Sequence, residues 1–159
     1  MGAVDLVQGL TERAWSVAFA ESCTGGRIAG ELTEVPGASA VFGLAVVSYS
    51  NAMKQRVLGV PEAVLVEHGA VSGACVEAML SGLRSLSGAD LCAAVSGIAG
   101  PGGGDEQKPV GTVWIAVSRR EQHWVTRQVF PGDRSGVRRA ASAKVFEGLN
   151  RLVEGHNPW

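Results

Sequence analysis

Three side chains that can act as nucleophiles stand together in ESCTGG (residues 21–26), where Ser22, Cys23 and Thr24 directly precede a glycine pair. A strand is predicted before this segment and a helix after it, so these side chains would lie beside a helix N-terminus. The free N–H groups there favour an anion, such as a phosphate or the oxyanion of acyl transfer. A simple turn in which Ser22 or Thr24 caps the helix fits as well, and the segment alone favours that role. Cys23 is a rival nucleophile, because a helix N-terminus lowers the pKa of a thiol.

A serine nucleophile needs a base, and the histidines do not provide one. His68, His123 and His156 stand at positions that give no convincing Ser–His–Asp arrangement. A partly buried lysine is the other option, since its amine can be neutral near about pH 7. Lys54 follows Tyr49, the only tyrosine, in the segment YSNAMK, and both side chains could face one pocket. Taken alone, a solvated lysine and a packed tyrosine are the simpler interpretation.

The glycine-rich segment SGIAGPGGGDEQKPVG, residues 96–111, is a third candidate. No lysine–serine or lysine–threonine pair follows its glycines, and they lead into a strand, so neither a Walker motif nor a dinucleotide fingerprint fits. The amides of residues 97–100 could donate to a carbonyl or a phosphate, although a plain loop between strands fits equally. Arginines gather further along the chain, where they suit a solvated helix surface or an anion site: Arg127, Arg134, Arg138 and Arg139.

Alternating strand and helix patterns would position these segments. Apolar runs predict strands over 15–21, 40–50 and 91–100, followed by a hairpin of strands over 112–118 and 123–130. The strand–helix alternation of the first two-thirds predicts right-handed crossovers, and the hairpin adds antiparallel strands. The sequence therefore predicts a three-layer α/β/α sandwich with a mixed, mostly parallel sheet. Ligands of such sheets bind beyond the carboxyl ends of strands, where the three polar segments can converge.

Helical spacing of apolar residues predicts a helix over 3–13 and another over 25–35. Asn51 is expected to cap a short helix, Ser72 a longer one, and Asp133 the C-terminal helix.

Composition limits the classes of function. At 159 residues and 16.4 kDa the chain is expected to fold as one domain over residues 1–159. Its formal net charge of −1 gives no general electrostatic case for binding nucleic acid or an anionic membrane. The three cysteines are odd in number and widely spaced, which favours a reducing compartment over a disulfide framework or a zinc site. With no basic, signal-like N-terminus and no long apolar stretch, a cytoplasmic location is expected.

Five segments, taken in order, carry a resemblance: AESCTGG, VSYSNAMKQRVLGV, HGAVS, SGIAGPGGG…KPVGTVWIAV and FPGDRSGVRRAA. Together they resemble the CinA C-terminal domain family, the nicotinamide-nucleotide amidases, over residues 4–153. The resemblance implies a single CinA C-terminal-like amidase domain, in the stand-alone form. Its expected reaction is hydrolysis of nicotinamide mononucleotide (NMN) to nicotinate mononucleotide and ammonia, in pyridine nucleotide recycling.

The family motifs also imply roles for individual residues. The motif serine falls on Ser22, the expected nucleophile. The motif tyrosine and lysine fall on Tyr49 and Lys54, with Lys54 expected to take the serine proton either directly or through Tyr49. Arg134 falls on the arginine expected to bind the substrate phosphate. The full set expected to bind substrate is Thr24, Gly25, Gly26, Ser96, Gly97, Ala99, Gly100 and Arg134. The family more often has threonine in place of Ser96, so the hydroxyl is kept, and Asp105 and Glu106 are acidic where small residues are common.

The resemblance further implies NMN as a small-molecule partner, no nucleic acid, no membrane, no metal and no cofactor. It also implies a homo-dimer or higher homo-oligomer. Because fold does not fix function, a non-catalytic nucleotide-binding or regulatory module on the same fold is the competing hypothesis. A serine amidase acting on another small amide is a third.

Overall fold

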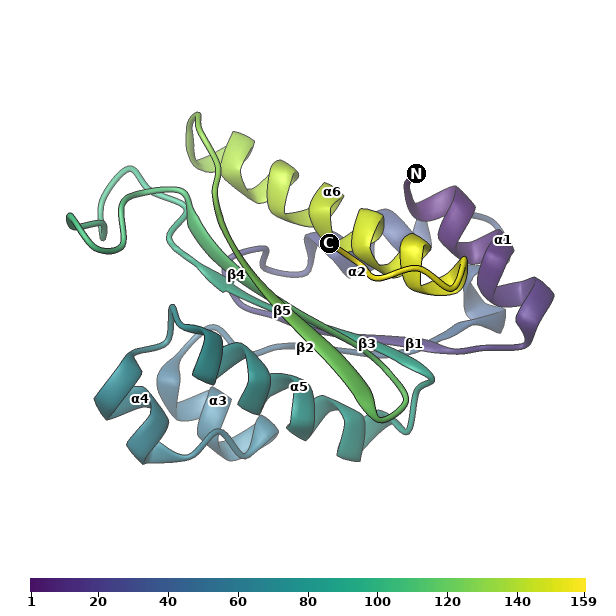
Figure 1. Ribbon diagram of the computed structural model, residues 1–159, viewed down its shortest axis with the longest axis horizontal. Coiled ribbons are helices and arrows are strands. Elements are labelled where there is room, and N and C mark those ends of the chain that lie inside the picture. The colour runs from purple at the N-terminus through teal and green to yellow at the C-terminus, as the bar shows by residue number, and fades with distance from the viewer.

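The computed structural model describes residues 1–159 as a five-stranded sheet between two layers of helices (Figure 1). The strands are β1 (Val17–Glu21), β2 (Phe42–Val47), β3 (Leu91–Gly97), β4 (Thr112–Arg119) and β5 (Gln122–Val129). One face is covered by α1 (Ala3–Arg13), α2 (Arg27–Thr33) and α6 (Arg134–Val153). The other is covered by α3 (Asn51–Leu58), α4 (Glu62–His68) and α5 (Gly73–Ser87), and a short 3-10 helix, η1 (Ala38–Ala40), precedes β2.

The strand order is β2-β1-β3-β4-β5. β1 lies between β2 and β3 and pairs with both in parallel, whereas β4 pairs antiparallel with β3 and with β5. β4 alone therefore runs against the other strands. This arrangement confirms the predicted three-layer sandwich with a mixed, mostly parallel sheet.

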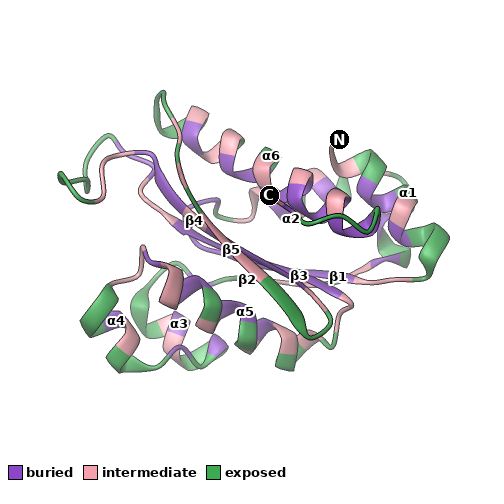
Figure 2. Cartoon of the chain, viewed as in Figure 1, coloured by how far each residue is buried: buried purple, intermediate pink, exposed green.

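β1 is buried along its whole length (Figure 2), and alternation along it decides which side chains meet which helix layer. Val17 and Phe19 pack in the core beneath α1, α2 and α6, and Ala18 and Ala20 pack in the core beneath α5. The same alternation turns Glu21, the last residue of the strand, towards the layer that contains α2. Glu21 is fully buried there.

Side chains cap the N-termini of α3, α5 and α6. The predicted caps Ser72 and Asp133 are confirmed, because their oxygens accept the amides of Cys75 and Gly136. The prediction for Asn51 is wrong by one residue. Ser50 has the extended backbone of a cap and accepts the Met53 amide at 3.2 Å, so Asn51 is the first residue of α3.

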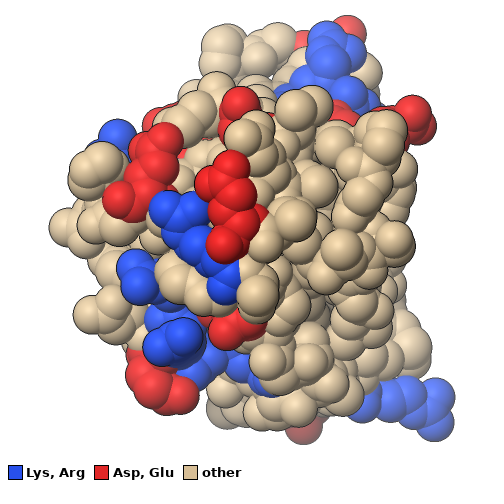
Figure 3. All heavy atoms as spheres, turned by 90° about the vertical axis from the view of Figure 1, so that its right-hand side faces the viewer, with Lys and Arg blue, Asp and Glu red and all other residues tan.

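The surface carries charges of both signs. On the face seen in Figure 3, basic and acidic side chains lie together on one side and at the edges, and a broad area between them is uncharged. None of the helices combines the length and the apolar character needed to cross a bilayer.

Candidate active site

A cavity of about 300 Å³ lies beyond the carboxyl ends of β1 and β3. Ser22 and Cys23 reach it from the turn after β1, and Tyr49 and Lys54 reach it from the segment after β2. Most of the remaining wall comes from residues 96–100, 102 and 103 and from Arg134 at the start of α6. The three polar segments that follow strands in the sequence thus line one cavity.

A short hydrogen bond in the cavity joins Ser22 to Lys54. The Nζ atom of Lys54 lies 2.8 Å from Ser22 Oγ, and the lysine side chain reaches it from inside the fold, since the residue is only 1% exposed. Nζ also donates to the carbonyls of Ser48, at 2.8 Å, and Tyr49, at 3.4 Å. None of these acceptors is a carboxylate, so no negative charge compensates a protonated Lys54.

Burial lowers the pKa of Lys54 from its ordinary value, because an ammonium ion loses its hydration in this position. Any thiolate at Cys75 or Cys23 would act in the opposite direction with smaller effect. A neutral amine has two N–H donors and one lone pair. If such an amine donated both N–H groups to the carbonyls of Ser48 and Tyr49, its lone pair would be left for Ser22 Oγ.

Tyr49 and Arg134 form a second pair at the cavity rim. Arg134 donates to the Tyr49 hydroxyl at 2.9 Å and to the Gly100 carbonyl at 2.8 Å. The phenol thus contacts Arg134, while Tyr49 approaches Lys54 through its backbone carbonyl. The predicted relay of a proton through the Tyr49 side chain has no hydrogen bond in the structure, whereas Ser22 and Lys54 are in direct contact.

Glu21 is a site residue that the sequence analysis missed. Its carboxylate accepts the amides of Gly26, Ile28 and Ala29 at 2.9–3.2 Å, and so takes up the free N–H groups at the start of α2. The prediction that Ser22 or Thr24 caps this helix is therefore wrong. A signal was present in the sequence, because strand alternation directs Glu21 towards the helix that follows.

The expected substrate-binding residues divide into two groups. Ser96, Gly97, Ala99 and Gly100 line the cavity together with Arg134. The remaining three do not line it: Thr24, Gly25 and Gly26. The Thr24 hydroxyl is buried without a partner, and the Gly26 amide is bound to Glu21, so neither of these groups faces the cavity. Asn51, Ala70 and Val71 also line it; they lie in the quoted segments YSNAMK and HGAVS, but no binding role was expected of them.

Cys23 lines the cavity beside Ser22, but its thiol is not activated. Burial raises the pKa of Cys23 to about 11, although its own backbone amide and the charges of Arg138 and Lys54 act to lower it. The expectation that a helix N-terminus could lower this pKa is wrong. The α2 amides are bound to Glu21, and the desolvation of a buried thiolate outweighs the remaining attractions.

The histidines remain at the surface. His68, His123 and His156 are exposed and none of them lines the cavity. No group of three or more His, Cys, Asp or Glu side chains is arranged to hold a metal ion.

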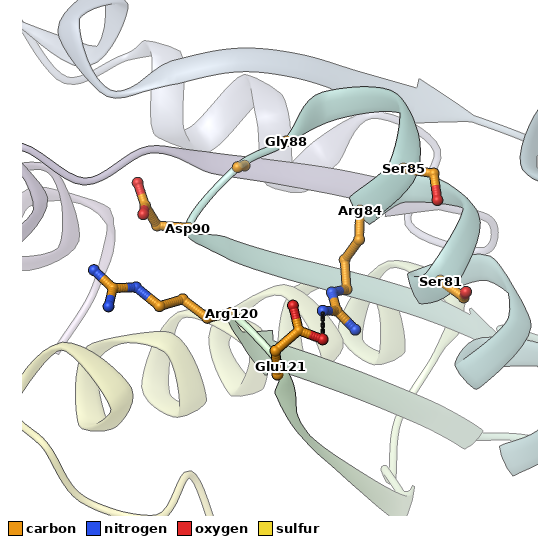
Figure 4. A pocket seen from close by; sticks show the side chains of 8 residues that line it. Ser81, Arg84, Ser85, Gly88, Asp90, Arg120 and Glu121 are labelled. Carbon is orange, nitrogen blue, oxygen red and sulfur yellow. Dashed lines mark ion pairs between the residues drawn. The ribbon is translucent and has the colours of Figure 1, made fainter.

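A second hollow, of about 610 Å³, lies at the opposite end of β3 (Figure 4). Arg84 on its wall pairs with Glu121 at 3.1 Å, and Asp90 accepts the backbone amide and the hydroxyl of Ser16. The serines on the wall, Ser81 and Ser85, are exposed and have no buried amine beside them. This hollow therefore has hydroxyls and charges but no base positioned against a nucleophile.

Residues 2–153 match the model of the CinA C-terminal domain family. A CinA-like protein of Thermotoga maritima is 47% identical over 150 residues, which cover 94% of this chain and 36% of the relative. The nicotinamide-nucleotide amidohydrolase PncC of Pseudomonas putida is 51% identical over 136 residues, 86% of this chain and 85% of the relative. This chain thus spans about a third of the CinA-like relatives and most of the amidohydrolase.

Solved structures give the same fold. A CinA superfamily protein of Klebsiella pneumoniae superposes with a TM-score of 0.92 at 37% identity, covering 96% of both chains. A competence/damage inducible protein of Agrobacterium tumefaciens superposes with a TM-score of 0.89 at 36% identity, covering 97% of this chain and 96% of that one.

Proposed function

The chain belongs to the CinA C-terminal domain family, and from the chemistry of its cavity we propose that it is an amidase that hydrolyses NMN to nicotinate mononucleotide and ammonia. The observation that carries the proposal is the buried Lys54 amine 2.8 Å from Ser22 Oγ, in a cavity beyond the carboxyl ends of the strands. The identity of 51% to a protein named as a nicotinamide-nucleotide amidohydrolase supports the choice of substrate.

In the first half of the reaction Ser22 attacks the carboxamide carbon. Neutral Lys54 accepts the proton of Ser22 Oγ as the new C–O bond forms and the carbonyl oxygen becomes an oxyanion. The resulting ammonium of Lys54 then gives this proton to the departing nitrogen. The C–N bond breaks, ammonia leaves, and the nicotinoyl group remains on Ser22 as an ester.

In the second half a water molecule takes the place of the amine. Lys54, neutral again, accepts a proton from the water as its oxygen attacks the ester carbonyl. The bond to Ser22 Oγ breaks, Lys54 returns the proton to that oxygen, and the carboxylic acid that forms loses its remaining proton to solvent to give nicotinate mononucleotide as the carboxylate. The direct Ser22–Lys54 contact supports proton transfer without the phenol of Tyr49 in between.

Other cavity residues suit the rest of the substrate. The guanidinium of Arg134 makes two hydrogen bonds to this chain, and its remaining N–H groups suit a phosphate at the rim. Ser96 is buried, lines the cavity and donates no hydrogen bond within the chain, so its hydroxyl is available to substrate.

An assay of ammonia release with NMN, nicotinamide and NAD as alternative substrates tests this function. Turnover of NMN with little turnover of nicotinamide is expected, since nicotinamide lacks the phosphate that Arg134 would bind. Release of ammonia from another small amide but not from NMN would overturn the substrate. If no amide is hydrolysed, although NMN binds, the chain is a nucleotide-binding module instead.

The cellular setting stays a prediction. Three free, buried cysteines fit the reducing cytoplasm in which pyridine nucleotides are recycled. Analytical ultracentrifugation would check the expected homo-dimer or higher homo-oligomer.

A further inference from the structure

The turn that carries Ser22 is held from two sides by opposite charges. Glu21 binds the start of α2 from within the fold, as described above. From the other side Arg138, in the first turns of α6, reaches two successive carbonyls of the turn. Its Nε donates to the Cys23 carbonyl at 3.1 Å, and its Nη2 donates to the Thr24 carbonyl at 2.8 Å.

Gly25 makes room for this contact. A Cβ atom at this position would lie 3.3 Å from Arg138 Nη2, and the positive φ of +60° is one that a glycine adopts without strain. Arg138 is half-buried, so its hydrogen bonds to the turn are partly shielded from solvent.

Within the turn itself, residues 22–27, hydrogen bonds in the chain occupy most of the backbone amides. The Gly25 amide donates to the Ser22 carbonyl at 3.0 Å, and the Arg27 amide donates to the Thr24 carbonyl at 3.2 Å. With the first amides of α2 bound to Glu21, only the amides of Cys23 and Thr24 have no acceptor. Of these two residues Cys23 alone lines the cavity.

We infer that Arg138 is a positioning residue: by fixing the carbonyls of Cys23 and Thr24, it holds the turn so that the Cys23 amide faces the oxyanion formed on Ser22. The inference rests on the proposed function for its reaction. The Ser22 carbonyl is held by Gly25, and the Cys23 amide of the same planar peptide points the opposite way, out of the turn. Without Arg138 the turn can rotate, and an oxyanion donor that shifts by about 1 Å costs on the order of 100-fold in rate.

The test compares Arg138→Met with Arg139→Met. Arg139 is the next residue of α6 and donates only to the exposed side chain of Ser135, which makes it a matched control. We expect kcat for NMN to fall about 10- to 100-fold in Arg138→Met with KM within about twofold, and no change in Arg139→Met. Arg138→Lys, which keeps the charge but cannot reach both carbonyls in the same way, should lie between Arg138→Met and wild type. A uniform loss that follows the thermal stability of the variants, or an unchanged kcat in both Arg138 variants, would overturn the inference.

A substrate-independent probe separates this inference from the proposed function. A small fluorophosphonate labels an activated serine and places its phosphonyl oxygen in the oxyanion site. Intact-mass spectrometry should show labelling of Ser22 that is slower in Arg138→Met and unchanged in Arg139→Met. If wild type is labelled in this pattern but does not turn over NMN, the proposed substrate fails and the role of Arg138 stands. Equal labelling of all three proteins, together with NMN turnover, overturns the role of Arg138 alone.

Discussion

At one end of β3 lies the cavity of about 300 Å³ that holds Ser22 and Lys54, and at the other end lies the polar hollow of about 610 Å³. The larger hollow has serines and charged side chains, but its Arg84 is already paired with Glu121. The smaller cavity holds an amine that is buried without a carboxylate partner. Of the two, only the smaller cavity thus pairs a hydroxyl with a desolvated amine, and this pairing, not the size of the hollow, led us to propose it as the catalytic site.

Replacing a serine at each end of β3 should give the largest contrast. Ser22→Ala removes the proposed nucleophile, so kcat for NMN should fall by at least ~10⁴-fold while NMN still binds. Ser81→Ala, at the other end, should keep wild-type kcat. Steady-state ammonia release and calorimetric NMN binding measure the two effects. Substantial residual turnover by Ser22→Ala would refute the nucleophile.

The next largest effect on kcat is expected when the long basic side chain at each end of β3 is removed. Lys54→Met deletes the base, and kcat should fall on the order of 10³-fold, whereas Arg84→Met should leave it unchanged. Because burial lowers the pKa of Lys54, kcat/KM of wild type should rise with pH through that lowered value. The residual activity of Lys54→Met should lack this rise, and near-normal activity in this variant would show that Lys54 is not the base.

Arginine substitutions should affect substrate binding more modestly. Arg134→Ala is expected to raise KM for NMN about 10-fold with a smaller change in kcat, because a charge-assisted phosphate contact is lost. Arg120→Ala, in the larger hollow, is the control and should leave both constants unchanged. An unaltered KM in Arg134→Ala would move the phosphate elsewhere.

The buried lysine should also make stability depend on pH. Between the lowered pKa of Lys54 and its ordinary value of 10.5, the unfolded chain binds more protons than the folded one. The free energy of unfolding of wild type should therefore rise with pH relative to Lys54→Met. Both proteins keep the three cysteines, so their opposing contribution cancels in the difference. Urea unfolding at a series of pH values measures it, and a constant difference would contradict the lowered pKa.

The smallest effect is expected at Cys23. Its thiol stays protonated, with a pKa of about 11, so Cys23→Ala should keep kcat within about threefold and lose a little stability from the core. Cys23 would return as a rival nucleophile if a thiol reagent inactivated wild type but not Cys23→Ala, and if the untreated variant had a much lower kcat than wild type.

Much of this molecule could be predicted from local patterns, and the failures have a common cause. The strands, the sheet type and the caps at Ser72 and Asp133 follow from periodicity and hydrogen-bonding side chains near in sequence. The capping by Glu21 was missed because a carboxylate at a strand end resembles any solvated acid until the helix closes over it.

The contacts of Arg138 could not be predicted for a related reason. They join residues more than a hundred positions apart in the chain, since α6 crosses the sheet above the turn. Of the candidate site, the sequence indicated which residues have reactive groups. Burial, which decides that the Lys54 amine is activated and the Cys23 thiol is not, came only with the packing.

The central claim is that Lys54 is a neutral base for Ser22, and an NMR titration of its amine tests this most directly. With lysines labelled at Cε, Lys54 contributes one of three signals, which the Lys54→Met variant assigns by its absence. We expect this signal to titrate below the ordinary value of 10.5, with the same midpoint as the rise of kcat/KM for NMN. Titration at the ordinary value, or a midpoint unrelated to the kinetic one, would contradict it.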